Sequence, residues 1–237
     1  MFLNWQQGLI QTGRVDLNNV LFLYDPATNK DLVTGTTCGV VRANTPVDSV
    51  VMIDGNPTLK AAVSTSGVAI TFPTPIDLGI LDEWTIEWAA FPTSVPANYA
   101  TEMLMNYPGG GYIGARWTDA GFGARLQFTG GGFGNAATIW RIPTNYAQAS
   151  GHLARYAMVY KDGLISVYKD GVKQTMNNGT GQSTSSTSFP KAAGWQPFTT
   201  MNLGWINSTY ISWLGNYGRV RISSTARYLA NYTPQPI

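Results

Sequence analysis

Two residue types that build many catalytic and metal centres are almost missing from this chain of 237 residues, which has one cysteine and one histidine. The lone thiol, Cys38, excludes an intrachain disulfide and any zinc site built on cysteines. A single histidine, His152, cannot form a histidine cluster, and any Ser-His-Asp or Cys-His centre would depend on that one residue. We therefore expect no catalytic residues, no bound cofactor and no metal centre of these kinds.

Long apolar runs are also missing from the sequence. No stretch is long and apolar enough for a membrane span, and no basic segment followed by an apolar one stands at the N-terminus as in a cleavable secretion signal. We expect a protein that is soluble as made and has no membrane partner.

Charged side chains are scarce. They make up 12% of residues, about half the usual share, and the net charge of +2 gives no strong attraction to nucleic acid. The chain is instead rich in aromatic residues, with 8 Trp, 12 Tyr and 9 Phe. Such a surface suits a protein that is docked in an assembly or binds neutral ligands, although β-sandwiches in general use few charges.

Glycine and proline are abundant, with 26 and 13 copies, and no sustained 3.6-residue apolar period is present. This pattern predicts an all-β protein with little helix, an antiparallel jelly-roll β-sandwich. We expect a single domain over residues 16–237, preceded by an apolar arm over residues 1–15. The candidate strands are residues 20–24, 50–53, 68–72, 84–91, 102–106, 111–116, 124–128, 137–141, 155–160, 164–168, 172–176, 201–205 and 218–222.

Two Asp-Gly pairs, at 162–163 and 170–171, predict consecutive hairpins and hence a three-stranded meander. A type I′ turn at the first pair places apolar residues on one side of the sheet, in the facing pairs Tyr160–Ile165 and Met158–Val167. The other side is mixed and carries Arg155, Ala157, Ser166 and Tyr168. One packed face and one mixed face are typical of a sheet in a two-layer sandwich.

The segment 84–91 predicts a central strand, because Trp84, Ile86 and Trp88 share one face while Thr85, Glu87 and Ala89 share the other. The closing strand repeats this alternation, with Val220 and Ile222 on one side and Arg219, Arg221 and Ser223 on the other. The low-complexity segment Asn177 to Ser188 is too polar to pack, so we expect an exposed loop there.

Several arrangements that could carry chemistry are weak. Glu83 and Glu87 lie about 13 Å apart on one strand face, beyond the spacing of about 5 to 9.5 Å that glycosidases use, so we expect no enzymatic activity. A dinucleotide-type glycine pattern at 109–114 lacks the helix that should follow it. Asp25 and Asp31 fall in one loop, which leaves a structural Ca²⁺ open without predicting one.

Apolar residues near the N-terminus must be buried somewhere, either on the sandwich itself or on a neighbouring subunit. They are Phe2, Leu3, Trp5, Leu9 and Ile10. Near the other end, Trp205 is expected in the core, whereas Tyr210 and Trp213 flank a turn and are the aromatic candidates for stacking on a glycan.

The motifs WTIEW at 84–88, YKDGV at 168–172 and RVRI at 219–222, with Arg227-Tyr228 before the proline at 234, carry a family resemblance. Over roughly residues 66–234 the chain resembles the laminin G-like (concanavalin A-like) jelly-roll domains of bacteriophage structural proteins. One departure is that 216–218 reads Asn-Tyr-Gly where related domains have an acidic pair. Arg219 and Arg221 are therefore expected to lack acidic neighbours and to be available for a partner.

The resemblance implies a non-enzymatic structural protein of the virion. With no coiled coil and no repetitive shaft, the chain best suits a capsid decoration (cement) protein that stabilises the assembled head. Its partners would then be the major capsid protein or other virion proteins, with homo-oligomers on the particle. The alternative is a lectin-like, glycan-binding module of a phage tail or adhesion structure.

Overall fold

The computed structural model describes the chain in separate stretches. They are residues 17–43, 50–61, 67–92, 101–107, 111–118, 125–131, 140–142, 153–177, 183–188, 196–204, 215–234 and 237. The predicted arm at 1–15 lies outside them, as does His152. No helix occurs in these stretches, so none of the described residues belongs to a helix that could cross a membrane.

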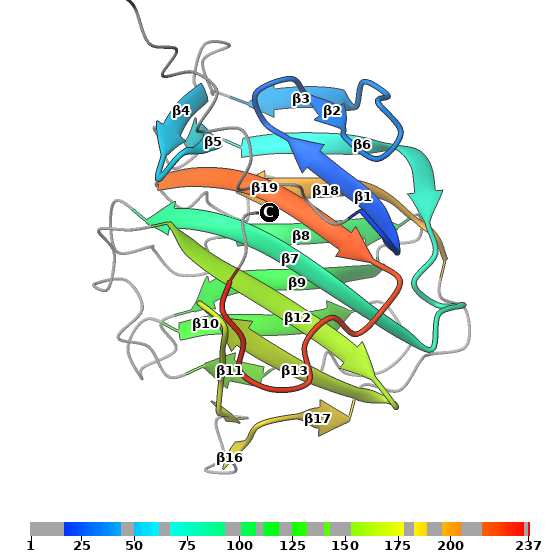
Figure 1. Cartoon of the computed structure of the whole chain (residues 1–237), viewed down its shortest axis with the longest axis vertical. Helices are drawn as coiled ribbons and strands as arrows, with labels where there is room; N and C mark the ends of the chain where they lie inside the picture. Colours follow the sequence, from blue (N-terminus) through cyan, green and yellow to red (C-terminus); the bar gives the residue numbers. More distant parts are fainter. Residues whose placement is uncertain are drawn as a thin grey trace, which may run out of the picture.

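The described strands form two antiparallel sheets packed face to face, a jelly-roll β-sandwich as predicted (Figure 1). The front sheet holds the central strand β7 (Glu83–Pro92) between β12 (Ala154–Lys161) and β19 (Gly215–Ser223). Its order continues outward from these three strands through β13 (Leu164–Lys169) and β14 (Val172–Lys173) on one side, and β1 (Val20–Asp25) and β2 (Lys30–Asp31) on the other. Smaller strands join it: β17 (Thr187–Ser188) on β13, β5 (Asn56–Ala61) on β19, and β4 (Val50–Ile53) on β5.

The back sheet lies behind the front sheet in Figure 1 and provides the other wall of the core. Its strands, in order across the sheet, are β16 (Ser183–Thr184), β15 (Met176–Asn177), β11 (Trp140–Ile142), β10 (Arg125–Gly131), β9 (Gly111–Thr118), β8 (Thr101–Tyr107), β18 (Phe198–Gly204), β6 (Gly67–Ile76) and β3 (Gly39–Ala43).

The core between the sheets follows the predicted alternation along β7. Trp84, Ile86 and Trp88 are buried in it with Val220 and Ile222 of β19. The two indoles stack on tyrosines of the neighbouring strand β12, each pair with ring centroids 5.3 Å apart. These stacked pairs fix the register between β7 and β12 as well as filling volume.

The predicted hairpins are confirmed. Asp162 and Gly163 have φ angles of 51° and 76°, and Asp170 and Gly171 have 47° and 79°, as type I′ turns require. Tyr160 faces Ile165 and Met158 faces Val167. The same signal at Asp54-Gly55, with φ angles of 49° and 73°, joins β4 to β5 in a third hairpin that we did not predict.

Two local predictions need correction. The segment 172–176 is divided between β14 in the front sheet and β15 in the back sheet, so the chain changes layers there. Residues 183–188 were expected in an exposed loop, yet they form the short strands β16 and β17, which pair with β15 and β13. Main-chain hydrogen bonds to the edges of the two sheets form these short strands, and such bonds do not require apolar side chains.

Candidate functional site

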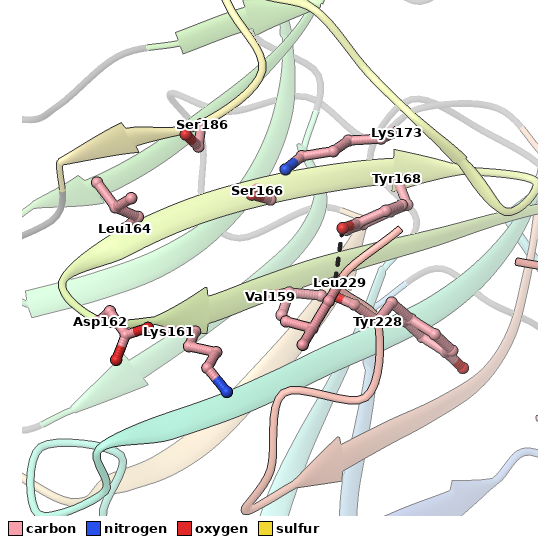
Figure 2. Close-up of a pocket in the computed structure, with 10 residues that line it drawn as sticks. All are labelled: Val159, Lys161, Asp162, Leu164, Ser166, Tyr168, Lys173, Ser186, Tyr228 and Leu229. Atoms are coloured by element: carbon pink, nitrogen blue, oxygen red, sulfur yellow. Dashed lines mark hydrogen bonds between the residues drawn. The ribbon is translucent and has the colours of Figure 1, made fainter. Parts of the chain in front are cut away.

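A pocket of about 170 Å³ lies on the outer face of the front sheet, the face turned away from the core (Figure 2). Strands β12 and β13, the turn between them, β14, the β16–β17 turn and the C-terminal tail all contribute to it. The lining residues are Val159, Lys161, Asp162, Leu164, Ser166, Tyr168, Lys173, Ser186, Tyr228 and Leu229.

Strand alternation produces the floor of this pocket. Because Met158 and Val167 point into the core, their neighbours Val159, Ser166 and Tyr168 point outward. Val159 and Tyr168 are themselves buried, in a small second cluster that lies beneath the C-terminal tail. The floor is therefore apolar where the tail covers it and polar at Ser166.

The tail, residues 224–234, crosses the outer face and forms one wall (Figure 1). The Thr85 hydroxyl donates to the main-chain oxygen of Thr225 (2.7 Å) and accepts from the amide of Arg227 (2.9 Å). The Tyr168 hydroxyl donates to the main-chain oxygen of Tyr228 (3.2 Å). These bonds anchor the tail to β7 and β13 and set Leu229 at the pocket.

A second set of bonds holds the end of the tail against the β13–β14 hairpin. The Tyr232 amide donates to the Gly171 oxygen, and the Lys173 amide donates to Asn231 Oδ1, both at 2.9 Å. The approach at Gly171 is so close that a Cβ there would overlap the Tyr232 main-chain oxygen. Glycine at this position is therefore needed both for the left-handed turn conformation and for the close approach of the tail.

Under the tail, beside the pocket, lies a buried ionic cluster. Arg221 and Glu87, 2% and 3% exposed, form a bidentate pair, with Nε to Oε2 at 2.6 Å and Nη2 to Oε1 at 2.7 Å. The Tyr228 hydroxyl donates to Glu87 Oε1 (2.6 Å), and Arg227 Nε lies 3.7 Å from Oε2. Burial lowers the pKa of Arg221, but the hydrogen bonds and charge of Glu87 outweigh it and raise that pKa overall.

The expectation that Arg219 and Arg221 lack acidic neighbours is wrong. Arg221 pairs with Glu87 across the β7–β19 ladder, and Arg219 Nε lies 3.0 Å from Asp25 Oδ1. The acids come from adjacent strands rather than from the residues just before β19. Arg221 has almost no surface to offer a partner, and Arg219 also donates to the main-chain oxygen of Ile237 (3.0 Å).

Three tyrosines link the tail to the sheet. Tyr228 and Tyr232 stack with ring centroids 3.5 Å apart and planes 4° apart, and Tyr168 contacts both rings. Burial, together with the charge and hydrogen bond of Glu87, raises the pKa of Tyr228 to about 12. Burial also raises the pKa of Tyr168 and, more strongly, that of Tyr232. All three tyrosine hydroxyls are therefore protonated at neutral pH.

The rim of the pocket mixes charge with exposed apolar surface. Lys161 forms an ion pair with Glu83 of β7 at 3.1 Å, and both side chains are partly exposed. Asp162 lies at the turn next to it, and Lys173 approaches from β14 (Figure 2). Leu164 and Leu229 are 44% and 63% exposed, so a ligand entering the pocket would meet apolar groups first.

The two aspartates that left calcium open, at the ends of β1 and β2, are engaged by other groups of the protein. Asp31 Oδ1 accepts from the amides of Leu23 and Val33 (3.0 and 3.1 Å), and Oδ2 accepts from the Thr34 hydroxyl. Asp25 Oδ2 accepts from Thr28 while Oδ1 pairs with Arg219. No group of three or more His, Cys, Asp or Glu side chains suited to a metal occurs among the described residues.

The predicted site residues and the pocket do not coincide. Tyr210, Trp213 and the apolar residues of the arm (Phe2, Leu3, Trp5, Leu9 and Ile10) lie outside the described residues, so their predicted roles stay predictions. Sequence reasoning placed Ser166 and Tyr168 on the outer face but did not identify the pocket. The missed signal was the aromatic pair Tyr228 and Tyr232 beyond the last strand, since two such rings so close to the end of the sandwich need a surface to pack against.

Known proteins share the fold of this chain, but none identifies its family. No family model and no curated protein matches the chain. Among solved structures it resembles domain 4 of an extracellular GH43 arabinanase from Geobacillus stearothermophilus, determined in complex with arabinotriose. The two are 15% identical with a TM-score of 0.57, over 88% of this chain and 93% of that domain.

Two further solved structures are similar over 89% of this chain. The receptor-binding domain of a botulinum neurotoxin C/D mosaic is 10% identical with a TM-score of 0.59, and the match spans 49% of that chain. A Trypanosoma rangeli sialidase in complex with sialic acid is 13% identical with a TM-score of 0.57, and the match spans 31% of it. At these identities the likeness establishes the jelly-roll β-sandwich fold alone.

Proposed function

We propose that this chain is a non-enzymatic carbohydrate-binding module whose ligand occupies the outer-face pocket. The observation that carries the proposal is the pocket itself, a small depression that combines apolar surface with convergent polar groups. Binding sites of this kind use apolar walls for affinity and a few placed polar groups for orientation. A sugar ring presents the complementary surface, with C–H groups on its faces and hydroxyls around its edge.

The lining divides in the way that a sugar ring requires. Val159, Leu164 and Leu229 can pack against C–H groups, while the hydroxyls of Ser166 and Ser186 can exchange hydrogen bonds with a ring edge. A volume of about 170 Å³ is below the roughly 300 to 1,000 Å³ of pockets for drug-sized ligands. The pocket therefore suits one sugar unit of a longer glycan.

The carboxylates argue for binding rather than hydrolysis. Among the described residues that line the pocket, Asp162 is the only acidic one, whereas glycosidases generally place two carboxyl groups across the bond they cleave. Glu87 is buried in its pair with Arg221, and Glu83 pairs with Lys161. The arabinanase domain that shares this fold over most of its length also supports sugar binding by a sandwich of this size.

A glycan array followed by calorimetry on the best-bound oligosaccharide tests this proposal. Ser166→Phe fills the floor of the pocket and Leu229→Ser removes apolar rim, so we expect each to weaken binding about tenfold or more. Met52→Ser on β4 is the matched control, because Met52 is 62% exposed and Leu229 63%. An array without bound sugars would refute the function, and binding that survives both pocket variants would refute the site.

Capsid decoration and a location in the virion stay untested predictions. No observation favours them over glycan binding: the arm assigned to a neighbouring subunit lies outside the described residues, and the arginines assigned to a partner are paired within the sheet. Co-sedimentation with assembled heads would be the measurement that revives this reading.

A further inference from the structure

Lys173 occupies one corner of the pocket and is held there by its main chain. It pairs with Tyr168 in the β13–β14 ladder, and its amide donates to Asn231 Oδ1 of the tail (2.9 Å). Its side chain is half-buried, and Figure 2 shows its amino group pointing toward Ser166, with Ser186 beyond. Strand, tail and turn together place an ammonium group and two hydroxyls on the lining of one pocket.

This ammonium differs from the other one at the pocket. Lys161 is neutralised by Glu83 at 3.1 Å. Lys173, by contrast, has no carboxylate within ion-pair distance among the residues that the structure describes. A partly desolvated charge without a counterion gains more from an anionic ligand than an exposed or paired one does.

The two serines complete a set of donors around this corner. Neither hydroxyl is bonded to another described residue: Ser186 uses its main-chain amide and oxygen in the contacts with Thr184 Oγ1, and Ser166 has its side chain on the pocket floor. One ammonium and two hydroxyls can donate to both oxygens of a carboxylate, and hydrogen bonds to charged groups are the stronger kind.

Asp162 stands on the opposite side of the pocket, at the β12–β13 turn (Figure 2). Its carboxylate can accept hydrogen bonds from sugar hydroxyls but repels a second negative charge. The pocket is therefore polarised, with a donor corner at Lys173 and an acceptor edge at Asp162. This arrangement favours a ligand unit with a single anionic group at one end and hydroxyls at the other.

We infer that the pocket selects an acidic sugar unit whose carboxylate lies between Lys173, Ser166 and Ser186, with its hydroxyls toward Asp162. The inference rests on the proposed sugar-binding function and makes it specific. No bond is made or broken, so the interaction is reversible and weakens with salt, because the pocket opens to solvent and the Debye length is about 8 Å at physiological ionic strength.

The test compares matched probes that differ in one charge. Methyl galacturonoside is measured against its methyl ester, and sialyllactose against the methyl ester of its single carboxylate, by calorimetry on the intact chain; a sulfated lactose distinguishes a carboxylate from a general anion. We expect at least one acid to bind about tenfold or more tightly than its neutral partner. In Lys173→Gln that preference should vanish while affinity for the neutral partner holds.

Lys60→Gln is the matched control, because it removes the same charge from an exposed position on β5. Acid and neutral probes bound equally, or a preference equally lost in both lysine variants, would overturn the acidic-sugar inference and leave sugar binding intact. A preference for the sulfated probe alone would overturn the carboxylate assignment. Failure of the wild-type chain to bind any sugar would instead overturn the proposed function and the inference together.

Discussion

The two faces of the front sheet are buried in different ways. Toward the back sheet, β7, β12 and β19 present tryptophans, tyrosines and aliphatic residues to a continuous core. On the outer face, the same strands present Glu87, Arg221 and Thr85, which are just as thoroughly buried beneath the C-terminal tail. The inner face is stabilised by loss of apolar surface from water, whereas the outer face also depends on the pairing of buried charges and hydroxyls such as those of Glu87, Arg221 and Thr85.

This difference explains where the pocket lies. The core is closely packed between the two sheets, whereas the tail covers the outer face only as far as its hydrogen bonds and aromatic contacts extend. Tyr228 and Leu229 form the boundary between the covered part of the outer face and the open part. The binding site we propose begins at that boundary, at the residues that line both the tail and the pocket.

The largest effect is expected from Arg221→Leu, which tests whether the outer face depends on paired charges. It leaves the Glu87 carboxylate buried without its bidentate partner, which we expect to lower the free energy of unfolding by about 3–5 kcal/mol. In the double variant Glu87→Leu/Arg221→Leu, most of that loss should be recovered, because two apolar side chains replace a matched charge pair. Urea unfolding monitored by tryptophan fluorescence measures both. A double variant no more stable than the single one would show that the tail needs the carboxylate itself as an anchor.

The sequence predicted the inner face of the front sheet well because the patterns that define this face involve residues close together in the chain. Alternation along 84–91 and the Asp-Gly turns act over a few residues, and both gave the correct strand faces and the correct hairpin register. The overlooked hairpin at Asp54-Gly55 carried the same local signal. These features depend on strand geometry and turn conformation, and both are encoded by residues that are close together in the sequence.

The outer face could not be predicted in the same way because its contacts are long-range. Glu87 and Arg221 are 134 residues apart, and Thr85 and Arg227 are 142 apart. Alternation put Glu87 and Arg221 on outward faces of their strands, but only the order β7–β19 brings them together. Looking for acids beside Arg221 in sequence, rather than on the adjacent strand, produced the wrong expectation.

A smaller effect is expected from Gly171→Ala, which tests whether the tail shapes the pocket. The added Cβ meets the Tyr232 oxygen and the Pro234 ring, and φ is +79°, so the variant is strained in the turn and pushes the tail away. We expect a destabilisation of about 1–3 kcal/mol together with weaker sugar binding. Gly55→Ala is the matched control, since Gly55 has φ of +73° and open space around its Cβ, in a turn that does not line the pocket. The control variant shares the strain in the turn but not the contact with the tail. An equal loss of binding in both variants would therefore show that the tail does not shape the pocket.

The smallest expected effect is an alkaline one, and its part on the outer face is isolated at Tyr228. The folded chain raises the pKa of Tyr228 to about 12, while an unfolded tyrosine ionises near 10. The unfolded state therefore loses this proton first, so stability should fall as pH rises from about 10 to 12 and be unaffected below that window. Tyr228→Phe keeps the ring but not the hydroxyl, and its unfolding free energy should decline less steeply across the window, by up to one proton. Cys38 and Tyr160 contribute to both proteins, whereas Tyr232, whose pKa is raised in part by Tyr228, adds to the difference between them in the same direction. A constant offset between the two curves from pH 7 to 12 would mean that the hydroxyl matters only as a hydrogen-bond donor, and that the outer face releases its protons as easily as the unfolded chain does.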